Sequence, residues 1–194
     1  MHEQYLSILR KHNIKYFYHF TSINNLDSIL LNGICNRAYM DKIGIKYFYT
    51  DENRFDNQMG CVSLSLDFAN KSMLLYKQKR LSTDWVIIQL NAEKVLTDFY
   101  NNIYYCKYNA SSPSVIKILN ENKKYLKTSY AFNNMFDETG KLNFQAELLL
   151  EGNVSCDYFH NIYVDSLQTK LIVQQMIENS KYKNIGVIIK KEMF

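Results

Sequence analysis

A ten-residue stretch near the end of the chain, residues 143–152 (NFQAELLLEG), constrains the fold more than any other. Its apolar residues alternate with others, which predicts a half-buried strand that ends at Gly152. On such a strand Gln145 and Glu147 share a face and lie about 7 Å apart, because successive side chains point to opposite sides. A carboxylate stabilises developing positive charge and an amide orients a polar partner, so the pair suits catalysis. The simpler interpretation is an edge strand with its polar face in water.

The rest of the chain shows short strand and helix patterns. Strands are predicted over residues 14–20, 61–68, 85–90, 104–106, 159–165 and 185–189. Helices are predicted over residues 2–11, 21–33, 73–76, 91–96, 114–124 and 167–179. Residues 35–60 lack clear periodicity and are expected to form a loop with some local order, and residues 130–143, which contain Gly140, are expected to form a second loop. Strands outnumber helices, so we predict an α+β fold: a single domain over residues 1–194 with a mostly antiparallel β core flanked by short helices.

Composition excludes several classes of protein. The 194 residues are 47% hydrophobic with six glycines and one proline, which indicates an ordered globular chain. The four cysteines are far apart and have no metal-ligand spacing, so we expect no metal. No leader and no apolar run of about 20 residues is visible, which predicts a cytoplasmic protein with no membrane partner. The net charge of +4 fits a polyanionic partner but is weak evidence for one.

Residues 14–33 carry the second notable pattern. An aromatic, β-branched run is followed by Thr21 and Ser22, which are favoured N-cap residues, and Gly33 is typical of a helix end. This places His19 and Thr21 near a junction where helical N–H groups are available to a ligand. The alternative is that His19 is only a hydrogen-bonded residue at the end of a strand.

Several motifs together resemble the DarT family of ADP-ribosyltransferases, toxins that transfer ADP-ribose from NAD to bases in DNA. They are Tyr18-His19-Phe20-Thr21, Asn25-Leu26, Ser28-Ile29-Leu30, Asn32-Gly33-Ile34, Asn53-Arg54-Phe55-Asp56, Val62-Ser63-Leu64-Ser65, Lys71-Ser72-Met73-Leu74-Leu75-Tyr76, Asp84-Trp85-Val86, Asn109-Ala110-Ser111 and Gln145-Ala146-Glu147-Leu148-Leu149. The resemblance implies a split β core and a toxin–antitoxin or phage-defence role. It further implies NAD as co-substrate, single-stranded DNA as acceptor and a cognate antitoxin that hydrolyses ADP-ribosyl-DNA.

The resemblance also implies residue roles. Glu147 matches the catalytic glutamate, and Arg54 matches an arginine beside the NAD phosphates and the reacting base. The positions matching the cofactor site are His19, Phe20, Thr21, Ser28, Asn36 and Arg54. For Arg54 the alternative is a surface ion pair with a neighbouring aspartate, worth about 0–1 kcal/mol.

Two features bear on the acceptor. Gln145, two residues before Glu147, resembles the Q-x-E arrangement of transferases that modify an amide, a guanidinium-like group or a guanine nitrogen. The chain also lacks the long arginine-rich insertion that many thymidine-modifying relatives carry near Arg54. Both favour the guanine-modifying branch of the family. The remaining alternatives are an RNA-modifying transferase of the same fold and a catalytically idle module that binds NAD or nucleic acid.

Overall fold

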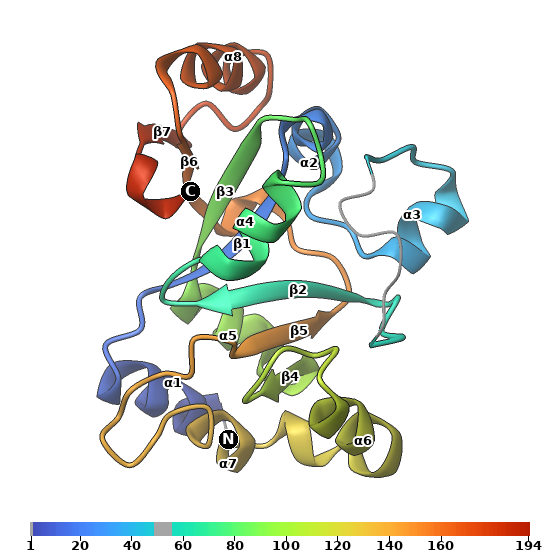
Figure 1. Ribbon diagram of the computed structural model, residues 1–194, viewed down its shortest axis with the longest axis vertical. Helices are drawn as coiled ribbons and strands as arrows, with labels where there is room; N and C mark the ends of the chain where they lie inside the picture. The colour runs from blue at the N-terminus through green and yellow to red at the C-terminus, as the bar shows by residue number, and fades with distance from the viewer. Residues whose placement is uncertain (1, 49–55) are drawn as a thin grey trace.

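The computed structural model describes residues 2–48 and 56–194, and its centre is a seven-stranded sheet in the order β4-β5-β2-β1-β3-β6-β7 (Figure 1). The strands are β1 (Tyr16–Ser22), β2 (Cys61–Leu66), β3 (Trp85–Asn91), β4 (Ile103–Cys106), β5 (Glu147–Glu151), β6 (Phe159–Val164) and β7 (Gly186–Ile189). Neighbouring strands of this sheet are antiparallel, apart from the parallel pair β6 and β7. The predicted α+β class with a mostly antiparallel core is confirmed.

The helices that surround the sheet are short. They are α1 (His2–Lys11), α2 (Leu26–Asn32), α3 (Arg37–Ile43), α4 (Lys71–Gln78), α5 (Ala92–Phe99), α6 (Pro113–Asn122), α7 (Ser129–Asn133) and α8 (Leu167–Glu178). Short 3₁₀ turns occur at Ile23–Asn25, Tyr100–Asn102, Tyr125–Lys127, Cys156–Tyr158 and Lys191–Met193. Over the part of the chain that the structure describes, no helix has the length and apolarity needed to cross a bilayer.

The two faces of the sheet are covered differently. One face carries the main core, in which apolar residues of β1, β2, β3 and β5 pack against α1, α2, α5, α7 and α8. The other face carries two separate, smaller clusters. The α4 cluster comprises Tyr18, Ala69, Leu74, Trp85, Ile87 and Tyr163. The α6 cluster comprises Cys61, Tyr104, Cys106, Ala110, Val115, Leu119, Leu126 and Leu149. The strip of sheet between these clusters is where polar residues reach the surface.

The sheet splits between its two central strands. All seven residues of β1 pair with β3, whereas β1 pairs with β2 only at Phe17–Leu66 and Tyr18–Ser65. Beyond Tyr18 the strands diverge, and in Figure 1 β2 and β5 run across the view while β1 and β3 run steeply. The split β core expected for the ADP-ribosyltransferase-like fold is therefore present.

The structure differs from the sequence predictions in three places. The strand predicted from residue 143 begins only at Glu147, because Asn143 accepts hydrogen bonds from the N–H groups of Gln145 and Ala146, both at 2.9 Å. That turn replaces strand pairing and leaves Phe144 61% exposed. The predicted loop 35–60 contains α3, which Asn36 caps, and the predicted loop 130–143 contains most of α7.

Candidate active site

A row of residues crosses the sheet on the face that carries the two smaller clusters. Residues directly opposite one another in antiparallel strands share a face. The pairing register therefore aligns Asn161, Gln89, Tyr18, Ser65, Glu147 and Cys106 from β6 to β4. Half of this row lies beneath α4: Gln89 donates to the Tyr18 hydroxyl at 3.0 Å and accepts from the Tyr163 hydroxyl at 3.1 Å. Ser65 and Glu147 are only half-buried, so the row opens to solvent between the two clusters.

Glu147 is held by a backbone turn. It is the first residue of β5, and its Oε2 accepts a hydrogen bond from the Ala110 N–H at 2.8 Å. Ala110 is only 1% exposed. The turn around it is closed by Asn109, whose side-chain oxygen accepts from the Ser111 N–H and whose carbonyl accepts from the Ser112 N–H, both at 2.9 Å. One carboxylate oxygen is thus fixed by a charge-assisted bond to buried backbone, a rigid arrangement.

The carboxylate also affects its neighbour Cys106, which lies directly opposite on β4. Burial, followed by the negative charges of Glu147 and Asp56, raises the pKa of the Cys106 thiol well above its ordinary value. A thiol in that state is protonated near neutral pH and is a poor nucleophile. Cys106 is therefore a packing residue of this site.

His19 lies where the sheet splits. Its ring Nδ1 is 3.0 Å from the Ser63 carbonyl oxygen of β2, so Nδ1–H donates across the divergence between β1 and β2. Ser63 and Ser65 are alternate residues of β2, and Ser65 is paired with Glu147. The predicted histidine and glutamate thus meet the same short segment of β2, at positions about 7 Å apart along it.

Thr21 and Phe20 of β1 take part in packing near the same split. Thr21 is buried, and its hydroxyl accepts from the Asn25 amide at 3.0 Å. Asn25 in turn exchanges two hydrogen bonds with the Phe48 backbone, at 2.6 and 3.0 Å. This anchors the chain beside the split immediately before residues 49–55. Phe20 packs against Trp85, with ring centroids 6.1 Å apart. Arg54 lies outside the described residues, so its predicted role has no structural test.

Ser28 and Asn36 have identifiable structural partners. The Ser28 carbonyl accepts from the Asn32 amide at 3.1 Å within α2. The Asn36 side-chain oxygen caps α3 by accepting from the Tyr39 N–H, and its side-chain nitrogen donates to Asn153, both at 2.9 Å. Asn36 is therefore engaged at both ends of its amide. Contact of either residue with a cofactor stays a prediction.

Gln145 differs from its predicted geometry. It is exposed and sits in the turn before β5, so the expected shared strand face with Glu147 is wrong. It still lies two residues from the carboxylate. The contact missed by sequence reasoning is the turn at Asn109–Ser112. Asn109-Ala110-Ser111 is one of the motifs that resemble the family, but nothing in the local sequence indicates that Ala110 contacts Glu147, 37 positions away.

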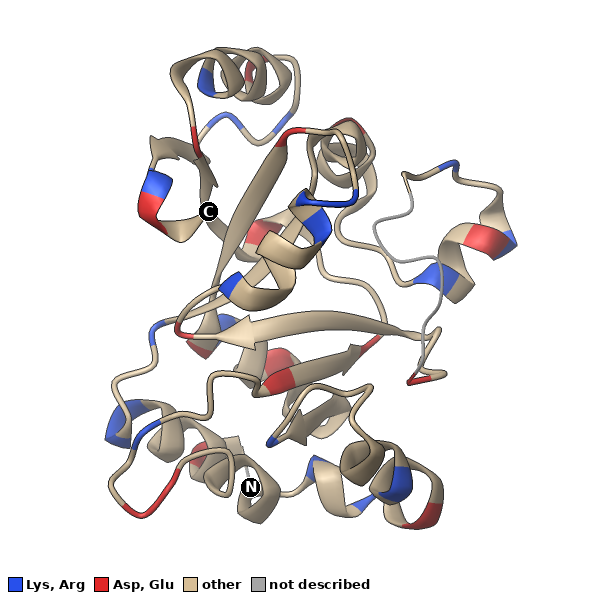
Figure 2. Ribbon diagram, viewed as in Figure 1, with Lys and Arg blue, Asp and Glu red and all other residues tan. Residues whose placement is uncertain are grey.

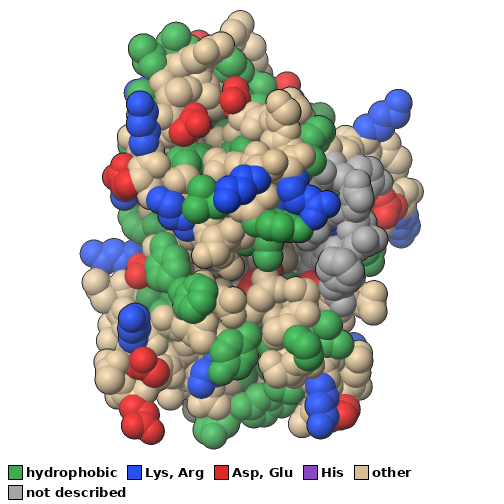
Figure 3. Space-filling model, viewed as in Figure 1, with side chains coloured by type: hydrophobic (Ala, Val, Ile, Leu, Met, Phe, Trp, Pro, Cys, Tyr) green, Lys and Arg blue, Asp and Glu red, His purple; other side chains and the backbone are tan. Residues whose placement is uncertain are grey.

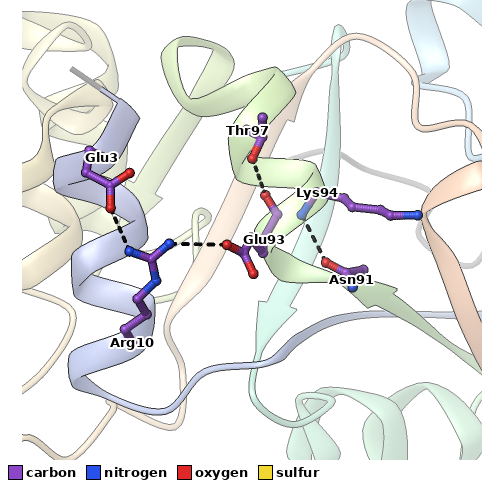
Figure 4. Close-up of polar contacts among 6 residues, drawn as sticks. All are labelled: Glu3, Arg10, Asn91, Glu93, Lys94 and Thr97. Atoms are coloured by element: carbon purple, nitrogen blue, oxygen red, sulfur yellow. Dashed lines mark hydrogen bonds and ion pairs between the residues drawn. The ribbon is translucent and has the colours of Figure 1, made fainter.

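Two cavities bounded by described residues lie elsewhere, around α5. One, of about 550 Å³, is lined by Asn91, Glu93, Lys94, Thr97, Asp98, Asp157 and Tyr158. The other, of about 400 Å³, is lined by residues of α1, the start of β1 and the start of α5. Figure 4 shows that Arg10 joins α1 to α5 by pairing with Glu3 at 2.6 Å and Glu93 at 3.3 Å. These ion pairs connect α1 and α5 on the main-core side.

Across residues 2–48 and 56–194, no group of three or more His, Cys, Asp or Glu residues is placed to hold a metal ion.

Several solved structures have a similar fold. The fold matches Thermus sp. 2.9 DarT in complex with NAD⁺ (TM-score 0.64, 16% identity, 93% of this chain and 97% of that chain). It also matches the same protein in complex with ADP-ribosylated ssDNA (TM-score 0.65, 15% identity, 93% and 96%). A third match is Thermosipho africanus DarTG in complex with ADP-ribose (TM-score 0.60, 20% identity, 93% and 51%). The chain thus spans about half of the Thermosipho chain. The fold is therefore that of the DarT structures.

The family follows from the sequence. Residues 18–194 match the family described as "ssDNA thymidine ADP-ribosyltransferase, DarT". Because the match covers most of the chain, the protein belongs to the DarT family, whose members are NAD-dependent ADP-ribosyltransferases that act on single-stranded DNA. A comparison with curated protein sequences found no match to this chain.

Proposed function

We propose that this protein transfers ADP-ribose from NAD to guanine in single-stranded DNA, with Glu147 as the catalytic carboxylate. The observation that carries the proposal is the hydrogen bond from the buried Ala110 N–H to Glu147, on the open strip between the α4 and α6 clusters. The implied biological setting belongs to the same proposal. It is a cytoplasmic toxin of a toxin–antitoxin or phage-defence system, paired with an antitoxin that hydrolyses ADP-ribosyl-DNA.

Glu147 acts on the sugar of NAD. Its carboxylate accepts a hydrogen bond from a hydroxyl of the nicotinamide ribose and stabilises the positive charge that develops as the ribose–nicotinamide bond breaks. Nicotinamide leaves with the bonding electron pair. The exocyclic amine of guanine forms the new bond to the anomeric carbon and then loses a proton to solvent. A carboxylate held by rigid backbone suits this role, because stabilisation of a short-lived cation depends on positioning.

His19, Phe20, Thr21, Ser28 and Asn36 form the NAD site in this proposal, together with Arg54 at the pyrophosphate. The support for it comes from the family motif and from the place of β1 at the split of the sheet. Thr21 acts through its bond to Asn25, which anchors the chain at Phe48. Arginine is a poor base near neutral pH, so Arg54 contributes charge rather than proton removal.

His19→Ala is expected to weaken NAD binding by about 2–10-fold, the equivalent of one net hydrogen bond. Thermal stability should change little, because His19 is only half-buried. Isothermal titration with NAD and a melting curve measure the two effects. His19→Asn is the matched variant, since its side chain retains a donor for the Ser63 carbonyl. A large drop in Tm with unchanged NAD affinity would show that His19 is structural.

Guanine is the point on which the proposal departs from the family description, which names thymidine. The support is Gln145, whose amide both donates and accepts and so complements a guanine edge that offers a carbonyl, a ring N–H and an amine. A thymine edge has no exocyclic amine. Because Gln145 is exposed, the expected preference for guanine is that of one net hydrogen bond, about 0.5–1.5 kcal/mol.

The experiment offers NAD and single-stranded oligonucleotides that each contain one reactive base type, with mass spectrometry to detect added ADP-ribose. We expect modification of the guanine strand, little on the thymine strand, and less on RNA of the same sequence. Gln145→Ala should lower transfer about 2–10-fold while NAD hydrolysis continues. Efficient modification of guanine-free strands would refute guanine selectivity and leave the transferase activity standing. No transfer to any strand would refute the proposed function itself.

A further inference from the structure

The outer face of α4 combines basic and aromatic side chains. Residues 71–80 (KSMLLYKQKR) contain four basic residues and no acidic one, and no acidic residue occurs between Asp67 and Asp84. Leu74 is fully buried against the sheet and Lys77 is also buried. Residues three or four apart on a helix are neighbours. The opposite side of α4, continued by the turn that follows, therefore presents two adjacent rows of exposed side chains. One row consists of Lys71, Leu75 and Lys79, and the other consists of Ser72, Tyr76 and Arg80.

Apolar and cationic groups within this face are in contact. Tyr76 is 54% exposed and Leu75 is 40% exposed. The Arg80 guanidinium lies 5.3 Å from the centroid of the Tyr76 ring and donates to the Tyr76 hydroxyl. Lys71 is the first residue of α4, and its Nζ donates a hydrogen bond to the Glu192 carbonyl at 2.9 Å. An aromatic ring is thus presented together with at least two exposed cations.

This face of α4 lies on the same side of the sheet as Glu147. Leu74 packs with Tyr18, which is opposite Ser65, which in turn is opposite Glu147. Figure 2 shows Lys and Arg positions along α4 and the turn that follows it, in front of the sheet. In the space-filling view of Figure 3, basic side chains form a row across the middle of this face, above a hollow in the surface. The basic face therefore borders the strip on which the candidate carboxylate opens.

We propose that the α4 face, formed by Lys71, Leu75, Tyr76, Lys79 and Arg80, binds the strand of single-stranded DNA that flanks the acceptor base. Lysine and arginine neutralise phosphates, and an exposed tyrosine offers a ring on which an unpaired base stacks. Arg80 adds a cation held close to that ring. The inference rests on the proposed function and deepens it, because it supplies a binding surface for the DNA strand.

The test measures, by fluorescence anisotropy and in the absence of NAD, the binding of a fluorescein-labelled DNA single strand of about 12 nucleotides. Lys79→Glu is expected to weaken binding about 10-fold and to reduce the slope of log K against log salt by about 0.7 or more. Lys94→Glu is the matched control. It changes net charge by the same amount, but Lys94 is an exposed residue of α5, which packs on the main-core face. The control should bind within about 2-fold of the parent.

Tyr76 tests the stacking contact separately. Tyr76→Ala should weaken binding about 5–150-fold, whereas Tyr76→Phe, which retains the ring, should bind like the parent. Melting curves verify that each variant is folded, and Lys79→Gln replaces Lys79→Glu if the latter melts early. The inference is wrong if Lys79→Glu and Lys94→Glu have equal effects, or if Tyr76→Ala binds like Tyr76→Phe.

These outcomes are independent of the proposed function. Parent-like DNA binding by the α4 variants, together with ADP-ribose transfer by the parent, would overturn the α4 surface and leave the transferase in place. Loss of binding in the α4 variants, with no transfer by the parent to any strand, would support the surface and refute the catalytic proposal.

Discussion

Glu147→Gln is expected to lower the rate of ADP-ribose transfer by about 10²–10³-fold or more, because it removes the negative charge that stabilises the ribosyl cation. Glutamine has nearly the same size and still accepts a hydrogen bond from the Ala110 N–H. The variant should therefore fold and melt like the parent. Single-turnover transfer to a guanine-containing strand, read by mass spectrometry, measures the loss. Near-normal turnover in a folded variant would remove Glu147 from the mechanism.

Glu151 provides a control within the same strand. It accepts from the Tyr104 hydroxyl and pairs with Lys127 at 2.5 Å. Burial alone raises the pKa of Glu151, but the hydrogen bonds from Lys127 and Tyr104 outweigh it, so the net pKa is lowered. Because its pKa is lower in the folded state than in the unfolded chain, ionised Glu151 stabilises the fold at neutral pH. This stabilisation is lost as the pH falls through the folded-state pKa and the carboxylate is protonated. Glu151→Gln should accordingly cost about 1 kcal/mol of stability and leave the transfer rate intact.

The contrast between these two glutamates illustrates how far the sequence alone can go. Alternation correctly predicted that Leu148 and Leu150 share one face of β5 and that Leu149 lies on the other, because strand periodicity is local information. It did not predict that Leu149 is buried in a second cluster. It could not show that Glu147 meets the Asn109–Ser112 turn, or that Glu151 meets Tyr104, since both contacts join distant segments. The same limit applies to the order of the strands, in which β1 lies between β2 and β3.

Local chemistry also overrode the strand pattern where the two competed. Phe144 fits the alternation of β5, but the side chain and carbonyl of Asn143 accept hydrogen bonds that close a turn before the strand begins. Asparagine commonly offers the backbone such an alternative partner. Local chemistry also gave a correct boundary: the sequence predicts that Gly33 ends a helix, and Gly33 is the C-cap of α2 in the structure.

Gly33→Ala is the substitution expected to affect stability most. Gly33 has φ +81° and ψ −178°, a combination that is essentially confined to glycine and costs other residues about 1–3 kcal/mol. A Cβ at this position would also lie 2.4 Å from the Val154 carbonyl oxygen, an atom that accepts from the Ile34 N–H at 2.8 Å. Backbone must move to relieve that contact, which adds about 1–3 kcal/mol. The sum, about 2–6 kcal/mol, corresponds to a fall in Tm of about 4–24 °C for a chain of this length.

Two other glycines serve as comparisons. Gly44 has φ +71° and ψ +24°, in the left-handed helical region, and an added Cβ would meet nothing within 4 Å. Gly44→Ala should therefore cost only the backbone preference of about 1–2 kcal/mol. Gly60 has neither a positive φ nor a close neighbour, so Gly60→Ala should be nearly neutral. Thermal melts of the three variants should rank in that order. A Gly33→Ala variant as stable as Gly44→Ala would show that the Ile34–Val154 bridge yields easily. In that case the bridge does not hold the segment that leads from α2 to α3 in place.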